Sequence, residues 1–148
     1  MKIIIHARSF FEARMGTRIE AELFRDYRII SINDVTHHPE PPPFSERFYS
    51  APNLLTLFFD DVEQDCPAAF SPEQAEEIIV FMAKRDDRPL LIHCMAGVSR
   101  SGAIGIVIAK HSNCIEEFIR GNPDIQPNEF VVKRLERGLQ GHILQGLE

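Results

Sequence analysis

One segment of the chain, residues 93–102, carries a cysteine and an arginine six positions apart with a glycine between them. A cysteine thiolate is a nucleophile, and the planar guanidinium of an arginine matches two oxygens of a phosphate group. Gly97 lies where a backbone that curls round an anion needs a positive φ or an approach too close for a side chain. The segment therefore predicts a phosphate-binding loop, with Cys94 as the nucleophile and Arg100 as the phosphate ligand.

The residues on either side of this loop predict the elements that hold it. Residues 89–92 are typical of a short buried strand, and residues 103–109 are typical of a buried helix. At a helix start, unpaired N–H groups and the helix dipole favour an anion and would stabilise a thiolate. We expect the Ser101 hydroxyl to donate a hydrogen bond to the sulfur of Cys94 when that sulfur leaves phosphorus, as a thiophosphate intermediate is hydrolysed. We expect His93 to orient the loop through a backbone hydrogen bond rather than to act as a base.

The loop can be compared with known active-site signatures through its order of residues, His93-Cys94-x-Ala96-Gly97-x-Ser99-Arg100-Ser101. This order resembles the signature of the cysteine-dependent protein tyrosine and dual-specificity phosphatases. The resemblance implies an enzyme that transfers phosphate to Cys94, stabilises the transition state with Arg100 and then hydrolyses the phosphocysteine, without a metal or organic cofactor. The loop residues implied to bind the substrate are Met95, Ala96, Gly97, Val98, Ser99 and Arg100.

The acid that protonates the leaving group must come from another part of the chain, and the resemblance implies a loop upstream of the cysteine. Asp60 and Asp61 lie there, directly after a predicted strand at residues 54–59. We favour Asp61, because small bacterial relatives place one variable residue between the strand and an aspartate that precedes a β-branched residue, here Val62. Asp60 is the alternative, and both carboxylates are also compatible with a solvated strand end.

The rest of the chain predicts an α/β fold with a central, mostly parallel sheet flanked by helices. Further strands are expected at residues 1–5 and 28–34. A helix is expected to start after Ser71, with a capping box to Gln74, and to end around residues 84–87. Strand-loop-helix order places the site at the carboxyl ends of the strands. At 148 residues, the chain is predicted to form one phosphatase-like catalytic domain over residues 1–148.

A final helix is expected from Asn128 past Leu139, and its candidate core contacts are Phe130, Val131 and Leu135. The resemblance implies a polar side chain near the attacking water at Asn128 or Gln126, and a helix cap explains Asn128 equally well.

Two cysteines outside the signature have separate interpretations. Cys66 lies on the predicted acid loop and is interpreted first as a small loop or core residue. The resemblance also allows it to form a protective disulfide with oxidised Cys94. Cys114 is expected in the core.

Adjacent histidines, His37 and His38, lie in a proline-rich connection over residues 36–43 that is expected to approach the pocket rim. No cysteine or carboxylate with ligand spacing accompanies them, so the sequence predicts no metal site.

Composition and charge narrow the expected partners. The formal net charge is −6, which disfavours nucleic acid and anionic membranes as partners. Met95 and Val98 are apolar, whereas similar phosphoinositide 3-phosphatases carry lysines in this loop. No apolar run approaches the ~20 residues of a membrane span. We therefore expect a cytoplasmic enzyme that acts on a phosphorylated protein or a small phosphomonoester, with tyrosine versus serine or threonine preference and oligomeric state left open.

Other functions remain compatible with a phosphate-binding loop. A pseudophosphatase that binds phosphate without turnover would lack the cysteine, the arginine or the acid, and none is plainly missing here. Arsenate reduction and sulfur transfer also use C-x5-R loops. Small arsenate reductases carry that loop near the N-terminus, and rhodanese-like proteins usually lack the serine-arginine-serine pattern, so both are less favoured.

Overall fold

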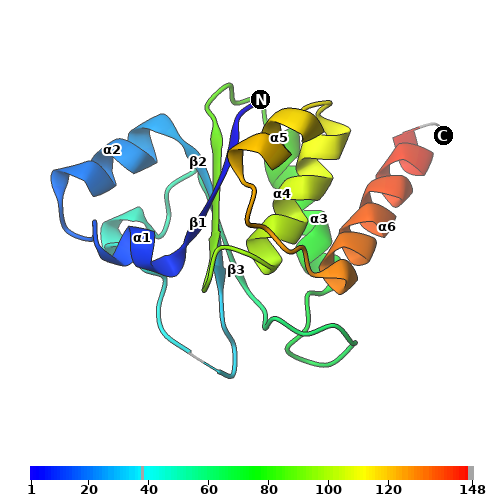
Figure 1. Cartoon of the computed structure of the whole chain (residues 1–148), viewed down its shortest axis with the longest axis horizontal. Helices are drawn as coiled ribbons and strands as arrows, with labels where there is room; N and C mark the ends of the chain where they lie inside the picture. The colour runs from blue at the N-terminus through cyan, green and yellow to red at the C-terminus, as the bar shows by residue number, and fades with distance from the viewer. Residues whose placement is uncertain (38, 147–148) are drawn as a thin grey trace.

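Four parallel strands form one sheet in the computed structural model, which describes residues 1–37 and 39–146 (Figure 1). The strands are β1 (Ile3–Ala7), β2 (Arg28–Asn33), β3 (Leu54–Phe58) and β4 (Leu90–Cys94). Their order across the sheet is β1-β4-β2-β3, and all neighbouring pairs are parallel. Every residue of the two central strands, β2 and β4, is buried, as expected where helices cover both faces. The parallel sheet predicted from the sequence is confirmed.

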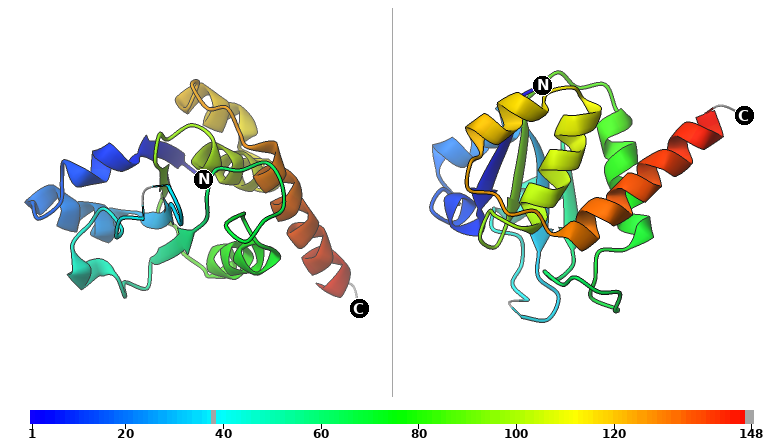
Figure 2. Two further views of the ribbon diagram at one scale, coloured as in Figure 1. Left: turned by 90° about the horizontal axis from the view of Figure 1, so that it is seen from below. Right: turned by 45° about the vertical axis from the view of Figure 1, so that its right-hand side comes forward.

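Six α-helices and one 3-10 turn accompany the sheet within the described residues. They are α1 (Arg8–Glu12), α2 (Arg18–Asp26), η1 (Glu46–Phe48), α3 (Pro72–Ala83), α4 (Arg100–His111), α5 (Ile115–Gly121) and α6 (Glu129–Gly146). Helices α1 and α2 cover one face, and α3 to α6 cover the other (Figures 1 and 2). The larger core lies on the α3 to α6 face, and a smaller aromatic-rich core lies under α1 and α2.

The local signals at the start of α3 act as predicted. The hydroxyl of Ser71 accepts a hydrogen bond from the backbone N–H of Gln74 at 3.0 Å, and the Gln74 side chain accepts one from the Ser71 N–H at 3.0 Å. Pro72 occupies the first helical position, where its missing N–H costs nothing. The helix ends at Ala83, close to the predicted end.

The elements on either side of the phosphate-binding loop are longer than predicted. Strand β4 continues to Cys94, and α4 begins at Arg100, so only residues 95–99 form the loop. Helices α1, α2 and α5 were not predicted from the sequence. No helix in the described residues is long and apolar enough to cross a membrane.

One core prediction in α6 is wrong. Val131 and Leu135 are buried, but Phe130 is only partly buried. Consecutive helical residues point about 100° apart, and the core-facing side of α6 extends from Val131 towards Val132, Leu135 and Leu139, in the direction opposite to Phe130. Its ring instead lies 4.5 Å below the guanidinium of Arg134.

Candidate active site

The phosphate-binding loop lies at the carboxyl edge of the sheet, between β4 and α4. Cys94 is the last residue of β4 and is 2% exposed. Gly97 has a φ of +70°, and a Cβ there would lie 2.7 Å from backbone atoms of His6 and Ala7. Gly97 therefore meets both reasons given for a glycine, a left-handed conformation and close packing against β1.

The carbonyl groups at both ends of the loop are hydrogen-bonded by groups outside it. The acceptor–donor pairs are Cys94 O with His93 Nδ1 (3.4 Å), Met95 O with Arg8 N (3.2 Å), Val98 O with Gln126 N (3.0 Å) and Ser99 O with Asn128 N (3.1 Å). No peptide bond in the described chain is cis, so the following N–H group points away from each of these carbonyls. A loop held in this way presents N–H groups to its own concave side, where an anion binds.

Ser101 lies in the first turn of α4, with its hydroxyl 3.0 Å from the sulfur of Cys94. The Ser101 side chain is fully buried, so this hydroxyl meets the thiol without competition from bulk water. The contact has the geometry needed for a hydroxyl to stabilise a cysteine thiolate.

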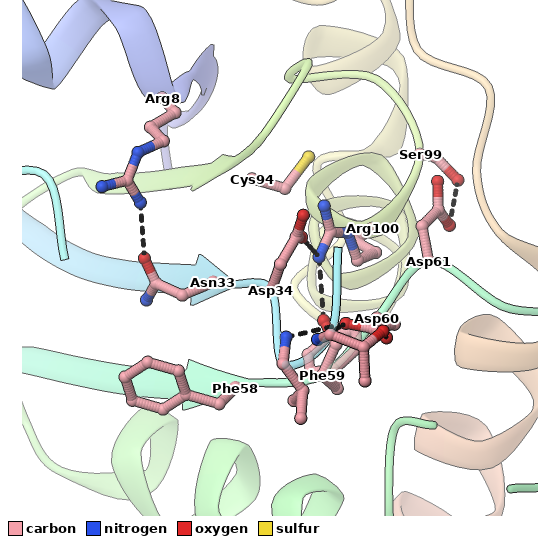
Figure 3. A network of polar contacts seen from close by, with 12 residues as sticks. Arg8, Asn33, Asp34, Phe58, Phe59, Asp60, Asp61, Cys94, Ser99 and Arg100 are labelled. Carbon is pink, nitrogen blue, oxygen red and sulfur yellow. Dashed lines mark hydrogen bonds and ion pairs between the residues drawn. The ribbon is translucent and has the colours of Figure 1, made fainter. Parts of the chain in front are cut away.

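Arg100 is 4% exposed, and one nitrogen of its guanidinium makes two hydrogen bonds. Its Nη1 donates to a carboxylate oxygen of Asp34 at 2.5 Å and to the carbonyl of Phe59 at 2.8 Å (Figure 3). Its Nε is buried and has no hydrogen-bond partner in the described residues. A buried N–H without an acceptor is costly, and a phosphate oxygen would supply the acceptor.

Asp34 is a site residue that the sequence analysis missed. It directly follows β2, the neighbour of β4, and it is 8% exposed. The available signal was its position, because the carboxyl ends of adjacent parallel strands meet at one edge of the sheet.

The two candidate acids, adjacent in sequence, have different surroundings. Asp61 is exposed, and its Oδ1 accepts hydrogen bonds from the Ser99 hydroxyl at 2.9 Å and the Asn128 side-chain amide at 2.7 Å. Asn128 also caps α6 by accepting from the N–H of Val131 at 3.2 Å. Asn128 thus has both the contact near the site and the capping contact considered from the sequence, whereas the side chain of Gln126 is exposed.

Asp60 is 3% exposed and points to the loop that follows β2. Its carboxylate accepts from the N–H of Val35 at 2.7 Å, from the N–H of Thr36 at 3.2 Å and from the Thr36 hydroxyl. Burial alone would raise its pKa, but these hydrogen bonds outweigh burial and lower it. An ionised, fully bonded carboxylate is a structural anchor and a poor proton donor.

The remaining candidate residues differ in exposure. Ala96 is exposed, while Met95 and Val98 are partly buried. Cys66 is exposed on the loop after Asp61, and Cys114 is buried, as expected.

The sequence predicts no metal site at the adjacent histidines His37 and His38. His37 is exposed, and His38 lies outside the described residues. No cluster of three or more His, Cys, Asp or Glu side chains that could hold a metal occurs among the residues that the structure describes.

Comparison by sequence finds no matching family model and no matching curated protein. Comparison by structure finds phosphatases. The PTP-2 phosphatase of Cydia pomonella is 19% identical with a TM-score of 0.63, covering 91% of this chain and 84% of that one. PTPMT1 in complex with PI(5)P is 12% identical with a TM-score of 0.62 (98% and 94% covered), and human DUSP28 is 17% identical with a TM-score of 0.58 (97% and 94%). This chain therefore has the fold of the cysteine-dependent tyrosine and dual-specificity phosphatases.

Proposed function

We propose that the chain is a cysteine-dependent phosphatase that hydrolyses phosphomonoesters through a phosphocysteine intermediate. The observation that carries the proposal is that Asp61, from a distant segment, joins Cys94 and Arg100 at one loop. Cys94 lies at its base, Arg100 has an unpaired buried Nε beside it, and Asp61 is hydrogen-bonded to it through Ser99. Nucleophile, anion ligand and acid are the groups that phosphoryl transfer to a thiolate requires.

In the first step, the thiolate of Cys94 attacks phosphorus, so that an S–P bond forms and the P–O bond to the leaving group breaks. The loop N–H groups and Arg100 stabilise the charge on the equatorial oxygens. Asp61, protonated, donates its proton to the leaving oxygen. Within the described residues both hydrogen bonds of Asp61 fall on Oδ1, which leaves Oδ2 to carry that proton.

In the second step, Asp61 as carboxylate takes a proton from water while the water oxygen attacks phosphorus. The S–P bond breaks, phosphate is released and Cys94 leaves as a thiolate. The hydroxyl of Ser101, 3.0 Å from the sulfur, stabilises the leaving thiolate by donating a hydrogen bond. Asn128 holds Asp61 in position for both steps.

The substrate class we favour is a phosphorylated protein, on tyrosine or on serine and threonine, or a small phosphomonoester. The neighbour PTPMT1 was solved with PI(5)P, which makes a phosphoinositide the competing substrate class. The apolar Met95 and Val98 and the net charge of −6 argue against a lipid on an anionic membrane.

A non-catalytic phosphate-binding module is the second candidate. It is supported by one structural neighbour, the human tyrosine phosphatase-like serine/threonine/tyrosine-interacting protein, which is 19% identical with a TM-score of 0.53 and covers 95% of this chain and 93% of that one. Such a module would use the same loop and Arg100 to hold phosphate without turnover.

The deciding experiment is hydrolysis of p-nitrophenyl phosphate across pH, in reductant and EDTA. We expect turnover by the parent, none by Cys94→Ser, and a loss of about 10²-fold or more in kcat with Asp61→Asn, the usual contribution of a general acid. Asp60→Asn is the matched control: it should lower stability and leave the acid-dependent pH profile in place. A folded parent that binds vanadate but turns nothing over would establish the binding module instead.

A further inference from the structure

A chain of buried polar side chains runs behind the loop on the α1 face of the sheet. Arg8 donates through Nη1 to the Asn33 side-chain oxygen at 3.2 Å, and the Asn33 amide nitrogen donates to the hydroxyl of Ser31 at 3.1 Å. That hydroxyl lies 2.6 Å from Nε2 of His93, whose Nδ1 lies 3.4 Å from the carbonyl oxygen of Cys94. Arg8 is 6% exposed and the next three residues at most 1% (Figure 3 shows the Arg8–Asn33 end).

The hydrogen-bonding capacity of each group fixes the direction of this chain. A guanidinium can only donate, so the oxygen of the Asn33 amide faces Arg8 and the nitrogen faces Ser31. The Ser31 oxygen therefore accepts from Asn33, and its second lone pair and its proton both remain available to Nε2 of His93. The carbonyl of Cys94 can only accept, so its contact with Nδ1 requires the neutral imidazole to carry its proton on Nδ1, and Nε2 then accepts the Ser31 proton.

The direction of these hydrogen bonds sets the tautomer of His93 only if the imidazole is neutral. The surroundings of His93 keep the imidazole neutral. Burial, opposed by the backbone contact to Cys94 and aided by the charges of Arg8 and Arg100, lowers the pKa of His93 to about 3. At neutral pH the ring has one proton to place.

Arg8 also holds the loop directly. Its backbone N–H donates to the carbonyl of Met95 at 3.2 Å. Its Nη2 donates to the carbonyl of Pro41 at 2.5 Å and its Nε lies 3.3 Å from the carboxylate of Glu40, contacts that fix the guanidinium. In trans peptides C=O and N–H point in opposite directions. Holding the carbonyls of Cys94 and Met95 outward therefore turns the N–H groups of Met95 and Ala96 towards the concave side of the loop.

We infer that Arg8 is a positioning residue of the phosphate-binding loop: it orients two successive loop amides, one through its own N–H and the other through a side-chain relay that sets the tautomer of His93. Arg8 touches no substrate. The consequence for anion binding rests on the proposed function, but the tautomer does not.

The sharpest variant is Asn33→Asp, which keeps the shape of the side chain and reverses the relay. A carboxylate accepts from both Arg8 and Ser31, so the Ser31 proton turns to residue 33 and the Ser31 oxygen accepts from Nε2 of His93. The His93 proton should move to Nε2. Arg8→Met leaves the Asn33 oxygen without this donor, while the Asn33 nitrogen keeps its contacts with the Ser31 hydroxyl at 3.1 Å and with the carbonyls of Ser31 and Leu57 at 3.3 and 3.4 Å. Arg8→Lys retains a donor and should keep the parent tautomer. Arg18→Met is the charge-matched control, because Arg18 is exposed and pairs only with Glu22.

The experiment is imidazole 15N NMR at neutral pH, with the His93 signals assigned by their loss in His93→Gln, combined with calorimetric binding of vanadate. We expect Nδ1–H in the parent, Arg8→Lys and Arg18→Met, and Nε2–H in Asn33→Asp with vanadate affinity about tenfold weaker, less than the ~10²–10³ cost of losing a catalytic donor entirely.

An Nε2–H tautomer in the parent, or Nδ1–H retained in Asn33→Asp, would overturn the relay. A tautomer switch with unchanged vanadate affinity would overturn the positioning role. If Arg8→Met does not fold, the isosteric Asn33→Asp still decides. A parent that shows the Nδ1–H tautomer and binds no vanadate refutes the proposed function and leaves the relay supported.

Discussion

The two ends of the phosphate-binding loop are held in different ways. At the start, the Cys94 carbonyl accepts from the side chain of His93, a buried residue of β4, and the Met95 carbonyl accepts from the backbone N–H of Arg8, the first residue of α1. At the end, the carbonyls of Val98 and Ser99 accept from backbone N–H groups of an irregular segment. Any residue except proline supplies a backbone N–H, so the end tolerates substitution, whereas the start depends on one particular side chain, that of His93.

Gly97→Ala tests both ends at once and should have the largest effect. A left-handed φ costs an alanine ~1–2 kcal/mol, and its Cβ would lie 2.7 Å from backbone atoms of β1 that cannot move cheaply. We expect vanadate affinity to fall by about 10²-fold or more, because the loop must shift. Gly16→Ala is the control. Gly16 has a φ of +76°, but no atom lies within 4 Å of where the Cβ would be, so this variant should lose only the stability that the left-handed backbone costs and should keep its vanadate affinity. Equal effects of the two substitutions would contradict the packing argument.

His93 should make the start of the loop sensitive to acid. Its folded pKa of about 3 lies below the unfolded value near 6.5, so below pH 6.5 the unfolded chain gains a proton that the native state excludes. This residue's stabilising contribution is therefore complete above pH ~6.5 and is lost at about 1.4 kcal/mol per pH unit as pH falls towards 3.

Urea unfolding of the parent and His93→Gln between pH 7 and 4 measures this contribution. The slope of unfolding free energy against pH should be shallower in the variant by about that amount. His6→Gln is the control, because burial and Arg14 lower the pKa of the partly buried His6 but by less. Parallel slopes for the parent and His93→Gln would mean that His93 titrates normally.

Asn128→Ala distinguishes the role of the Asn128 side chain from that of its backbone N–H at the end of the loop. It removes the cap of α6 and the hydrogen bond to Asp61, but the N–H that binds the Ser99 carbonyl remains. We expect a loss of about 1 kcal/mol in stability, typical of a cap. Turnover of p-nitrophenyl phosphate should fall while vanadate affinity changes less than twofold. A large loss of vanadate affinity would show that the side chain, and not the backbone, holds this end.

Gln126→Ala should have the smallest effect. The side chain is exposed and only its backbone N–H reaches the Val98 carbonyl, so stability should stay within about 0.5 kcal/mol. Gln126→Pro removes that N–H and is the matched contrast. If Gln126→Ala and Gln126→Pro weaken vanadate binding equally, the backbone N–H of Gln126 is not what holds the Val98 carbonyl.

Local sequence signals predicted much of the fold correctly. The four strands, the capped start of α3, the buried α4 and the parallel sheet follow from apolar runs and capping residues that act within a few positions. Helices α1 and α2 gave weaker signals, because α1 has only five residues and α2 is largely polar, with buried side chains that include Glu20. Phe130 was misplaced because an apolar side chain beside a buried one can equally lie under an arginine.

Sequence by itself determined the chemistry at the centre of the site. The spacing of Cys94, Gly97 and Arg100 predicts an anion-binding loop, because a nucleophile, a flexible residue and a fixed cation act over a few consecutive positions. Only the tertiary structure assigned different surroundings to Asp60 and Asp61 and brought Asp34 to Arg100 and Arg8 to the back of the loop. Those pairings join residues up to 87 positions apart, as between Arg8 and Met95, through strand order and burial, which no local pattern encodes.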